Sequence, residues 1–313
     1  MSRKHVFNIG FTLVFLVCFA CIIMFFKDDI LHALFRDGLF PIDETIEMEA
    51  CQNWTDDVRD FELTDREKAE SVSVLMYHRV VEEKHLNQYL TEDDGSIVST
   101  VILKSNFIKQ MDLLRDEGYT TLTLKELELF IKGEIDVPKK SIVLTFDDGF
   151  KDNAKEVYPI LKERGLKGVS FVITGAISKF DAKYQPGEYQ YFSASDIISS
   201  CDVFDFQSHT YNYHQRMEDD TPFLIGKEDE QVTQDLERSL VNLNGRNQAF
   251  ASPYGGYDEG NIETFQELGF DMAFTVIPND VTRETSVYEI PRKEVFPDDS
   301  LEDFKEKIGL NVP

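Results

Sequence analysis

The sequence has little positive charge for its length. It contains 32 Lys and Arg residues against 58 Asp and Glu residues, which gives a formal net charge of −26. This surplus of negative charge argues against nucleic acid or an anionic lipid surface as a partner of the folded part. For most of the acidic residues, keeping an exposed protein in solution is a sufficient explanation.

Cysteine is scarce as well, with four residues in the chain. Cys18 and Cys21 lie in an apolar N-terminal run, so that only Cys51 and Cys201 remain for the rest of the protein. These two could pair in an oxidising compartment, but two cysteines do not make a disulfide framework. Neither has the spacing of a metal site, and the sequence assigns them no chemistry. Internal repeats and low-complexity segments are also absent from the sequence.

There is one long apolar run, at residues 6–26. It is long enough to cross a bilayer as a helix, and Arg3 and Lys4 before it favour a cytoplasmic N-terminus. The sequence therefore predicts a cytoplasmic tip and membrane anchor over residues 1–27, with the remainder outside the cell. A cleaved signal peptide is the alternative, although its apolar core is usually shorter and ends at small residues.

Residues 28–70 are acidic and show weak periodicity, which predicts a stalk or a strap along the following domain. From residue 71 to residue 313, apolar runs of strand length alternate with helical patterns. Strands are expected at 71–80, 122–124, 141–146, 169–173, 203–206, 250–252 and 272–277, and helices at 107–114, 125–132, 228–244 and 261–268. Because β and α segments alternate, the fold class is α/β with a largely parallel sheet.

The run 141–146 ends abruptly in Asp147, Asp148 and Gly149. In parallel sheets, chemistry gathers at the carboxyl ends of the strands. Two neighbouring side chains at a strand end point in different directions, so one acid can bind a metal while the other stays free as a base. The alternative is an Asp-Asp-Gly turn whose carboxylates cap the next helix.

His209 and His214 follow the predicted strand 203–206 and add two imidazoles. One carboxylate and two neutral imidazoles leave an open position on a divalent ion, as catalytic zinc requires. The combination with the acidic pair favours a metal site over two unrelated surface features.

Five motifs in order carry a resemblance to a known family. They are LMYHRV at 75–80, TFDDG at 145–149, HTYNYH at 209–214, SPYG at 252–255 and IPR at 290–292. Over residues 71–308 the chain resembles the polysaccharide deacetylases, the carbohydrate esterases of family four with a NodB-homology domain. The first and last motifs resemble more narrowly the branch of poly-beta-1,6-N-acetylglucosamine N-deacetylases.

The resemblance implies a distorted (β/α)7-type barrel and a role for each motif residue. Asp148, His209 and His214 would bind the metal, most readily Zn²⁺, with Co²⁺, Ni²⁺ or Fe²⁺ as alternatives. Asp147 would act as the general base, and a backbone N–H near Tyr254 would stabilise the oxyanion.

Two departures from the family pattern concern the base and the acid. Many members carry an Arg where this chain has Ala251, and we expect Arg292 to take its place and reach Asp147 from another strand end. Many members also place a catalytic His near the C-terminus, but no His follows His214. In the branch named above the corresponding His comes from the first strand, which predicts His78 as the acid. A core histidine bonded to the backbone is the alternative for His78.

Tyr211, Tyr213, Tyr254 and Tyr257 are candidates for stacking against sugar rings, with packing or rim positions as the alternative. The predicted function is metal-dependent N-deacetylation of an extracellular N-acetylglucosamine polymer by a membrane-anchored enzyme. A cationic or partly deacetylated glycan is also the partner that the acidic chain would tolerate best. Peptidoglycan as substrate, O-acetyl ester hydrolysis and a catalytically silent glycan-binding module stay open as alternatives.

Overall fold

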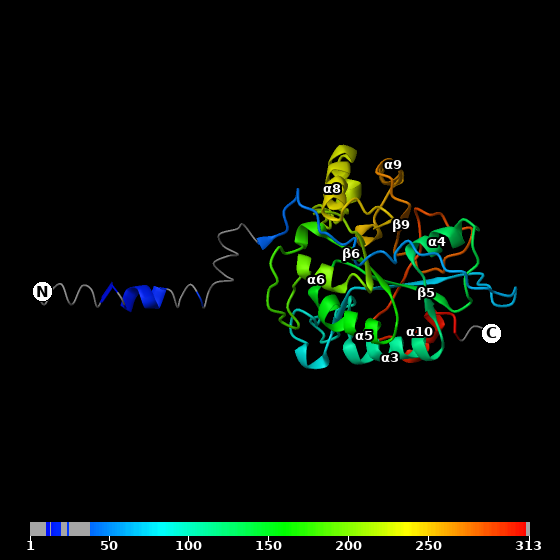
Figure 1. Cartoon of the computed structure of the whole chain (residues 1–313), viewed down its shortest axis with the longest axis horizontal. Coiled ribbons are helices and arrows are strands. Elements are labelled where there is room, and N and C mark those ends of the chain that lie inside the picture. Colours follow the sequence, from blue (N-terminus) through cyan, green and yellow to red (C-terminus); the bar gives the residue numbers. More distant parts are fainter. Residues whose placement is uncertain (1–10, 13, 20–23, 25–37, 311–313) are drawn as a thin grey trace, which may run out of the picture. The chain divides into compact units, whose positions relative to one another are not determined.

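A computed structural model describes residues 11–12, 14–19, 24 and 38–310 (Figure 1). The chain divides after Leu39 into two compact units. In the first, residues 11–12, 14–19 and 24 are helical. Most of the predicted anchor at 6–26 lies outside the described residues, and among those described no helix is long and apolar enough to span a membrane.

The second unit is built on one curled sheet whose described strands all pair in parallel, in the order β10-β1-β5-β6-β7-β8-β9 with β4 beside β5. Ile290, just before β10, bridges Phe274 of β9, so the two edges of the sheet approach each other. This α/β architecture fits a (β/α) barrel. The strands are β1 (Ser73–Tyr77), β4 (Thr120–Thr121), β5 (Ser141–Phe146), β6 (Gly168–Val172), β7 (Phe204–Ser208), β8 (Ala249–Ala251), β9 (Met272–Phe274) and β10 (Lys293–Glu294). A separate pair is formed by β2 (Arg79–Val81) and β3 (Val101–Leu103).

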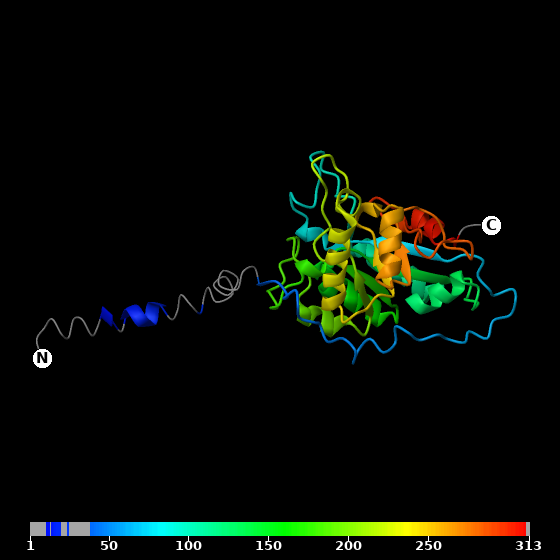
Figure 2. The ribbon, with the colours of Figure 1, turned by 90° about the horizontal axis from the view of Figure 1, so that it is seen from above.

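Helices surround the sheet (Figures 1 and 2). They are α3 (Lys104–Asp116), α4 (Leu124–Ile131), α5 (Tyr158–Glu163), α6 (Ala194–Ser200), α7 (Phe223–Gly226), α8 (Asp229–Asn242), α9 (Glu259–Glu267) and α10 (Leu301–Lys307). A π-helical turn, Asn153–Val157, precedes α5. Capping boxes fix several helix starts, as at Thr123 with Glu126 and at Ser193 with Asp196.

Both faces of the sheet are buried, which explains the nearly continuous apolar run of β5. Val143 belongs to the cluster inside the curl, together with Phe171 and Phe274. Leu144 faces outward into the second cluster, which includes Phe107 of α3. Side chains alternate along a strand, so Asp147 continues the inward-facing series of β5 and lies at the mouth of the barrel.

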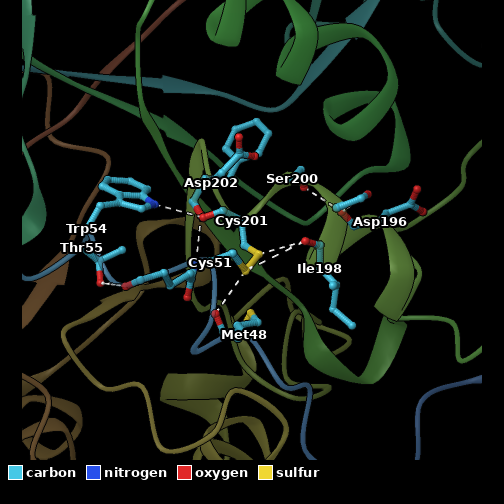
Figure 3. The surroundings of a disulfide bond; sticks show 12 residues. Met48, Cys51, Trp54, Thr55, Asp196, Ile198, Ser200, Cys201 and Asp202 are labelled. Carbon is cyan, nitrogen blue, oxygen red and sulfur yellow. Dashed lines mark hydrogen bonds between the residues drawn. A yellow bond between two sulfur atoms is a disulfide. The ribbon is translucent and has the colours of Figure 1, made fainter.

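Residues 40–69 run along the outside of the domain before the chain enters β1, as the blue to light-blue segment of Figure 2 shows. A disulfide joins Cys51 of this segment to Cys201 at the end of α6 (Figure 3). Nearby, the Trp54 indole donates to the carbonyl of Cys201 at 3.0 Å. Further on, Arg59 pairs with the buried Glu126 of α4. The segment is therefore bound to the domain by covalent, polar and ionic contacts.

Three expectations about strands differ from the structure. The predicted strand at 122–124 is wrong, because Thr123 caps a helix that already starts at Leu124. The single strand predicted at 71–80 breaks at His78 into β1 and β2, which belong to different sheets. Strands β3 and β10 were not predicted, since two or three residues give too short a pattern to detect.

Candidate active site

The two aspartates after β5 occupy different environments. Asp147 is buried, whereas Asp148 is partly exposed. Asp148 has φ +70° and Gly149 has φ +78°, so the chain turns in the left-handed region immediately after Asp147. A Cβ atom at Gly149 would lie 3.0 Å from the Val172 side chain, which explains the glycine. This turn separates the two carboxylates.

Arg292 holds Asp147 by a bidentate ion pair. Its Nη1 donates to Asp147 Oδ1 at 2.7 Å and its Nη2 donates to Oδ2 at 2.8 Å. The guanidinium is fully buried and also donates to the Thr275 carbonyl and the Thr145 hydroxyl. Burial raises the pKa of Asp147, but Arg292 and then His209 outweigh it, so the pKa lies below its usual value. Asp147 is therefore an ionised carboxylate in a fixed orientation.

Asp148, His209 and His214 converge on one point. Asp148 Oδ1 lies 3.1 Å from His214 Nε2 and 3.5 Å from His209 Nε2. One ligand atom from each of the three residues lies within 4.8 Å of the others. Asp148 Oδ1 is buried and accepts no hydrogen bond from the described residues.

The tautomer of His209 suits a metal ligand. Its Nδ1 lies 2.7 Å from the Ala251 carbonyl, which can only accept, so this nitrogen carries the proton. In the neutral ring, Nε2 then presents its lone pair toward Asp148. Two imidazole nitrogens and an unpaired carboxylate oxygen form a donor set that fits a divalent transition metal such as zinc.

Asp235 of α8 fixes the loop between the two histidines. Its carboxylate accepts the backbone N–H groups of Tyr211 at 2.8 Å and Asn212 at 2.9 Å. No sequence motif predicted a role for Asp235. Asp235 occupies a buried position of an amphipathic helix, between Val232 and Ser239, and an acidic residue at such a position is a sign of a specific role.

Tyr254 lies beside the triad. Its ring centroid is 4.6 Å from that of His214, and its hydroxyl donates to the His214 carbonyl at 3.3 Å. The guanidinium of Arg216, which belongs to none of the sequence motifs, lies 4.2 Å from the centroid of the Tyr254 ring. Tyr254 itself has φ +58°, an uncommon conformation for a residue other than glycine.

His78 stands at the break between β1 and β2, half-buried. Asp147 N–H donates to the carbonyl of Tyr77 at 2.9 Å, so the ends of β1 and β5 adjoin. His78 also contributes to lowering the pKa of both Asp147 and Asp148. His78 therefore belongs to the same mouth of the barrel as the two aspartates.

The remaining predicted tyrosines have contacts of their own. Tyr213 packs edge-on against Phe223, with ring centroids 5.5 Å apart, beside an apolar cluster that contains Phe250. Tyr257 donates its hydroxyl to Glu289 at 2.9 Å. The carbonyl of Tyr211 accepts the N–H of Gly175 at 2.8 Å. Sugar stacking by these three residues stays a prediction.

A parallel barrel with an Asp-His-His cluster and a separate ionised carboxylate at its mouth defines a hydrolase-type site. Comparisons with known proteins identify a domain of a known family. Residues 134–273 match the family model described as polysaccharide deacetylase. The chain is 26% identical over 249 residues to a poly-beta-1,6-N-acetyl-D-glucosamine N-deacetylase of Staphylococcus aureus, a match that covers 75% of this chain and 82% of that protein.

Solved structures share the fold. IcaB from Ammonifex degensii superposes with a TM-score of 0.62 at 24% identity, covering 78% of this chain and 97% of that one. The deacetylase PplD of Streptococcus pyogenes, solved with acetate, gives a TM-score of 0.65 at 22% identity, covering 76% of this chain and 98% of that one. The protein contains a polysaccharide deacetylase domain and is a hydrolase that acts on N-acetyl amides.

Proposed function

We propose that this protein is a metal-dependent enzyme that removes N-acetyl groups from an extracellular N-acetylglucosamine polymer of the poly-beta-1,6 type. The observation that carries the proposal is the pairing of an ionised carboxylate, Asp147, with the adjacent Asp148–His209–His214 cluster. A glycan-binding module has no need of a free base beside such a cluster, which disfavours the silent alternative.

Each residue at the mouth then takes one task. Bound zinc would act as a Lewis acid on the acetamide carbonyl and lower the pKa of water. Asp147, oriented by Arg292, accepts the proton of the attacking water, and a backbone N–H near Tyr254 stabilises the developing oxyanion. His78 donates a proton to the departing amine. The products are acetate and a glucosamine unit in the polymer.

The choice of polymer rests on the Staphylococcus aureus relative, whose name states poly-beta-1,6-N-acetyl-D-glucosamine as its substrate. The disulfide between Cys51 and Cys201 supports an oxidising compartment, because such bonds persist mainly outside the cytoplasm. Together with the apolar run at 6–26, this supports a membrane-anchored protein with its catalytic domain outside the cell.

The test is acetate release by the purified full chain, supplied with zinc, from β-1,6-linked N-acetylglucosamine oligomers and, in parallel, from peptidoglycan fragments. We expect release from the oligomers alone. Release from peptidoglycan alone would reassign the substrate to the cell wall and leave the catalytic roles intact. Release from neither, by protein with bound metal, would contradict the proposed activity on these polymers.

A further inference from the structure

A short segment that the proposed mechanism does not use lies against the loop after β5. Phe192 N–H donates to the Gly149 carbonyl at 2.9 Å, and Lys151 N–H donates to the Gln190 carbonyl at 2.8 Å. This antiparallel pairing places Tyr191 opposite Phe150, two residues after Asp148. The Tyr191 and Phe150 rings stack with centroids 5.2 Å apart and an interplanar angle of 17°.

Tyr189 extends the aromatic surface beyond Phe150. Its ring centroid lies 5.9 Å from that of Phe150. The buried guanidinium of Arg79 lies 4.7 Å from the Tyr189 ring and is held in turn by an ion pair with Asp152 at 2.8 Å. Tyr189 is nevertheless 53% exposed. The Tyr189 ring is therefore supported by a fixed cation, while about half of the residue stays open to solvent.

Tyr89 comes from the loop after β2 and completes the row. The Tyr189 hydroxyl donates to the Tyr89 carbonyl at 3.5 Å, and Asn87 Nδ2 donates to the Gly187 carbonyl at 3.2 Å. A Cβ atom at Gly187 would lie 2.6 Å from the His85 carbonyl oxygen, so the two loops need glycine to approach this closely. The Tyr89 side chain is 57% exposed.

We propose that Tyr191, Tyr189 and Tyr89 form a row of subsites that bind sugar rings of the polymer next to the unit being deacetylated. This inference rests on the function proposed above. Aromatic rings at the surface offer flat apolar faces for pyranose rings, and the stacked Tyr191 ring and the cation-supported Tyr189 ring do so at little entropic cost. The alternative is that the three tyrosines only stiffen their loops.

The row also sets a direction for the polymer. It adjoins the end of β5, whereas Tyr254 follows β8, and β6 and β7 lie between these strands in the sheet. A bound chain therefore crosses the mouth from the Tyr254 side to the Tyr189 side. Extra sugar units on the Tyr189 side increase the contact area, so longer oligomers are the better substrates.

The experiment compares kcat/KM for acetate release from a β-1,6-linked N-acetylglucosamine pentamer and dimer, using the zinc-loaded full chain. Tyr89→Ala and Tyr189→Ala are expected to lower the pentamer-to-dimer ratio by about tenfold, mainly through KM for the pentamer. Tyr189→Phe keeps the ring, removes only the hydroxyl and should retain the wild-type ratio. Tyr89→Ala should fold like the wild type, because the Tyr89 side chain is largely exposed, so a lower ratio in this variant would not reflect a folding defect.

An unchanged ratio in both alanine variants overturns the subsite row, and so does a ratio that falls only in Tyr257→Ala. A wild-type protein that releases no acetate from either oligomer contradicts the proposed function instead. In that case calorimetry with the pentamer still tests the row. Equal affinity of the wild type and both alanine variants would then rule it out.

Discussion

The two sides of the barrel mouth are stabilised by different kinds of interaction. Near β1, β5 and β10, buried side-chain ion pairs hold the chain: Arg292 with Asp147, and Arg79 with Asp152. Near β7 and β8, hydrogen bonds to main-chain groups fix the site. The Ala251 carbonyl orients His209, and Asp235 accepts backbone N–H groups of the loop between the two histidines. A base must keep its charge and direction in a dry site, whereas metal ligands need a fixed tautomer and loop geometry.

The largest expected effect is on activity, and it distinguishes the general base Asp147 from the metal ligand His209. Asp147→Asn should lower kcat by about 10²- to 10⁴-fold and keep the metal, because the amide cannot accept the proton of water. His209→Ala should lose both the metal and the activity. Metal content by mass spectrometry and acetate release check both statements. An Asp147→Asn protein without metal, or an active His209→Ala protein, would contradict the division between the two sides.

Arg292→Met tests the ion pair on the β10 side. Removing the guanidinium leaves the buried Asp147 carboxylate without its partner, and we expect a loss of about 3–5 kcal/mol in the free energy of unfolding. Urea denaturation of metal-free protein at neutral pH measures it. Arg115→Met is the control, because Arg115 pairs with Asp112 and Asp116 at the surface and should change stability little. Equal stability of both variants would show that Arg292 does not stabilise the buried charge.

Asp152 makes the same side sensitive to pH. Burial raises its pKa to about 6, although Arg79 opposes the shift, and Glu156 and the Tyr184 hydroxyl lie near it. Between pH 4 and 6 the unfolded chain releases this proton while the folded protein retains it, so stability falls as the pH rises. From pH 4 to pH 7, the free energy of unfolding of the wild type should fall by about 3 kcal/mol relative to that of Asp152→Asn.

Denaturation of both proteins across this pH range measures the Asp152 contribution. Asn cannot titrate, so the difference between the two curves isolates this one group. A difference that does not change with pH would mean that Arg79 keeps Asp152 ionised throughout.

The smallest effect concerns the histidine side. Asp235→Ala removes the acceptor for the N–H groups of Tyr211 and Asn212, and we expect zinc affinity to fall by about 10- to 100-fold. Competition with a chromogenic chelator measures this affinity. Glu237→Ala, an exposed position on the same helix, should bind zinc like the wild type. An unaffected Asp235→Ala variant would show that the Ala251 contact suffices to fix the ligands.

Much of the sheet could be predicted from local pattern. The strand at 141–146 coincides with β5, because a buried parallel strand is apolar throughout and ends abruptly at polar residues. Short or irregular elements were not predicted: β10 is two residues long, and Asn153–Val157 is a π-helical turn. These depend on neighbouring segments more than on their own residues.

The sequence by itself determined the acidic pair, the spacing of His209 and His214, and the family resemblance, because each is a pattern of neighbouring residues. Tertiary structure decided which groups support them, although the family resemblance already suggested Arg292 as the partner of Asp147. Arg292 meets Asp147 across 145 residues of chain, and Ala251 meets His209 across 42. The row from Tyr191 to Tyr89 joins two loops in the same way. Such contacts arise where strand ends and loops converge. The periodicity of a sequence predicts single helices and strands, but not which distant segments come into contact.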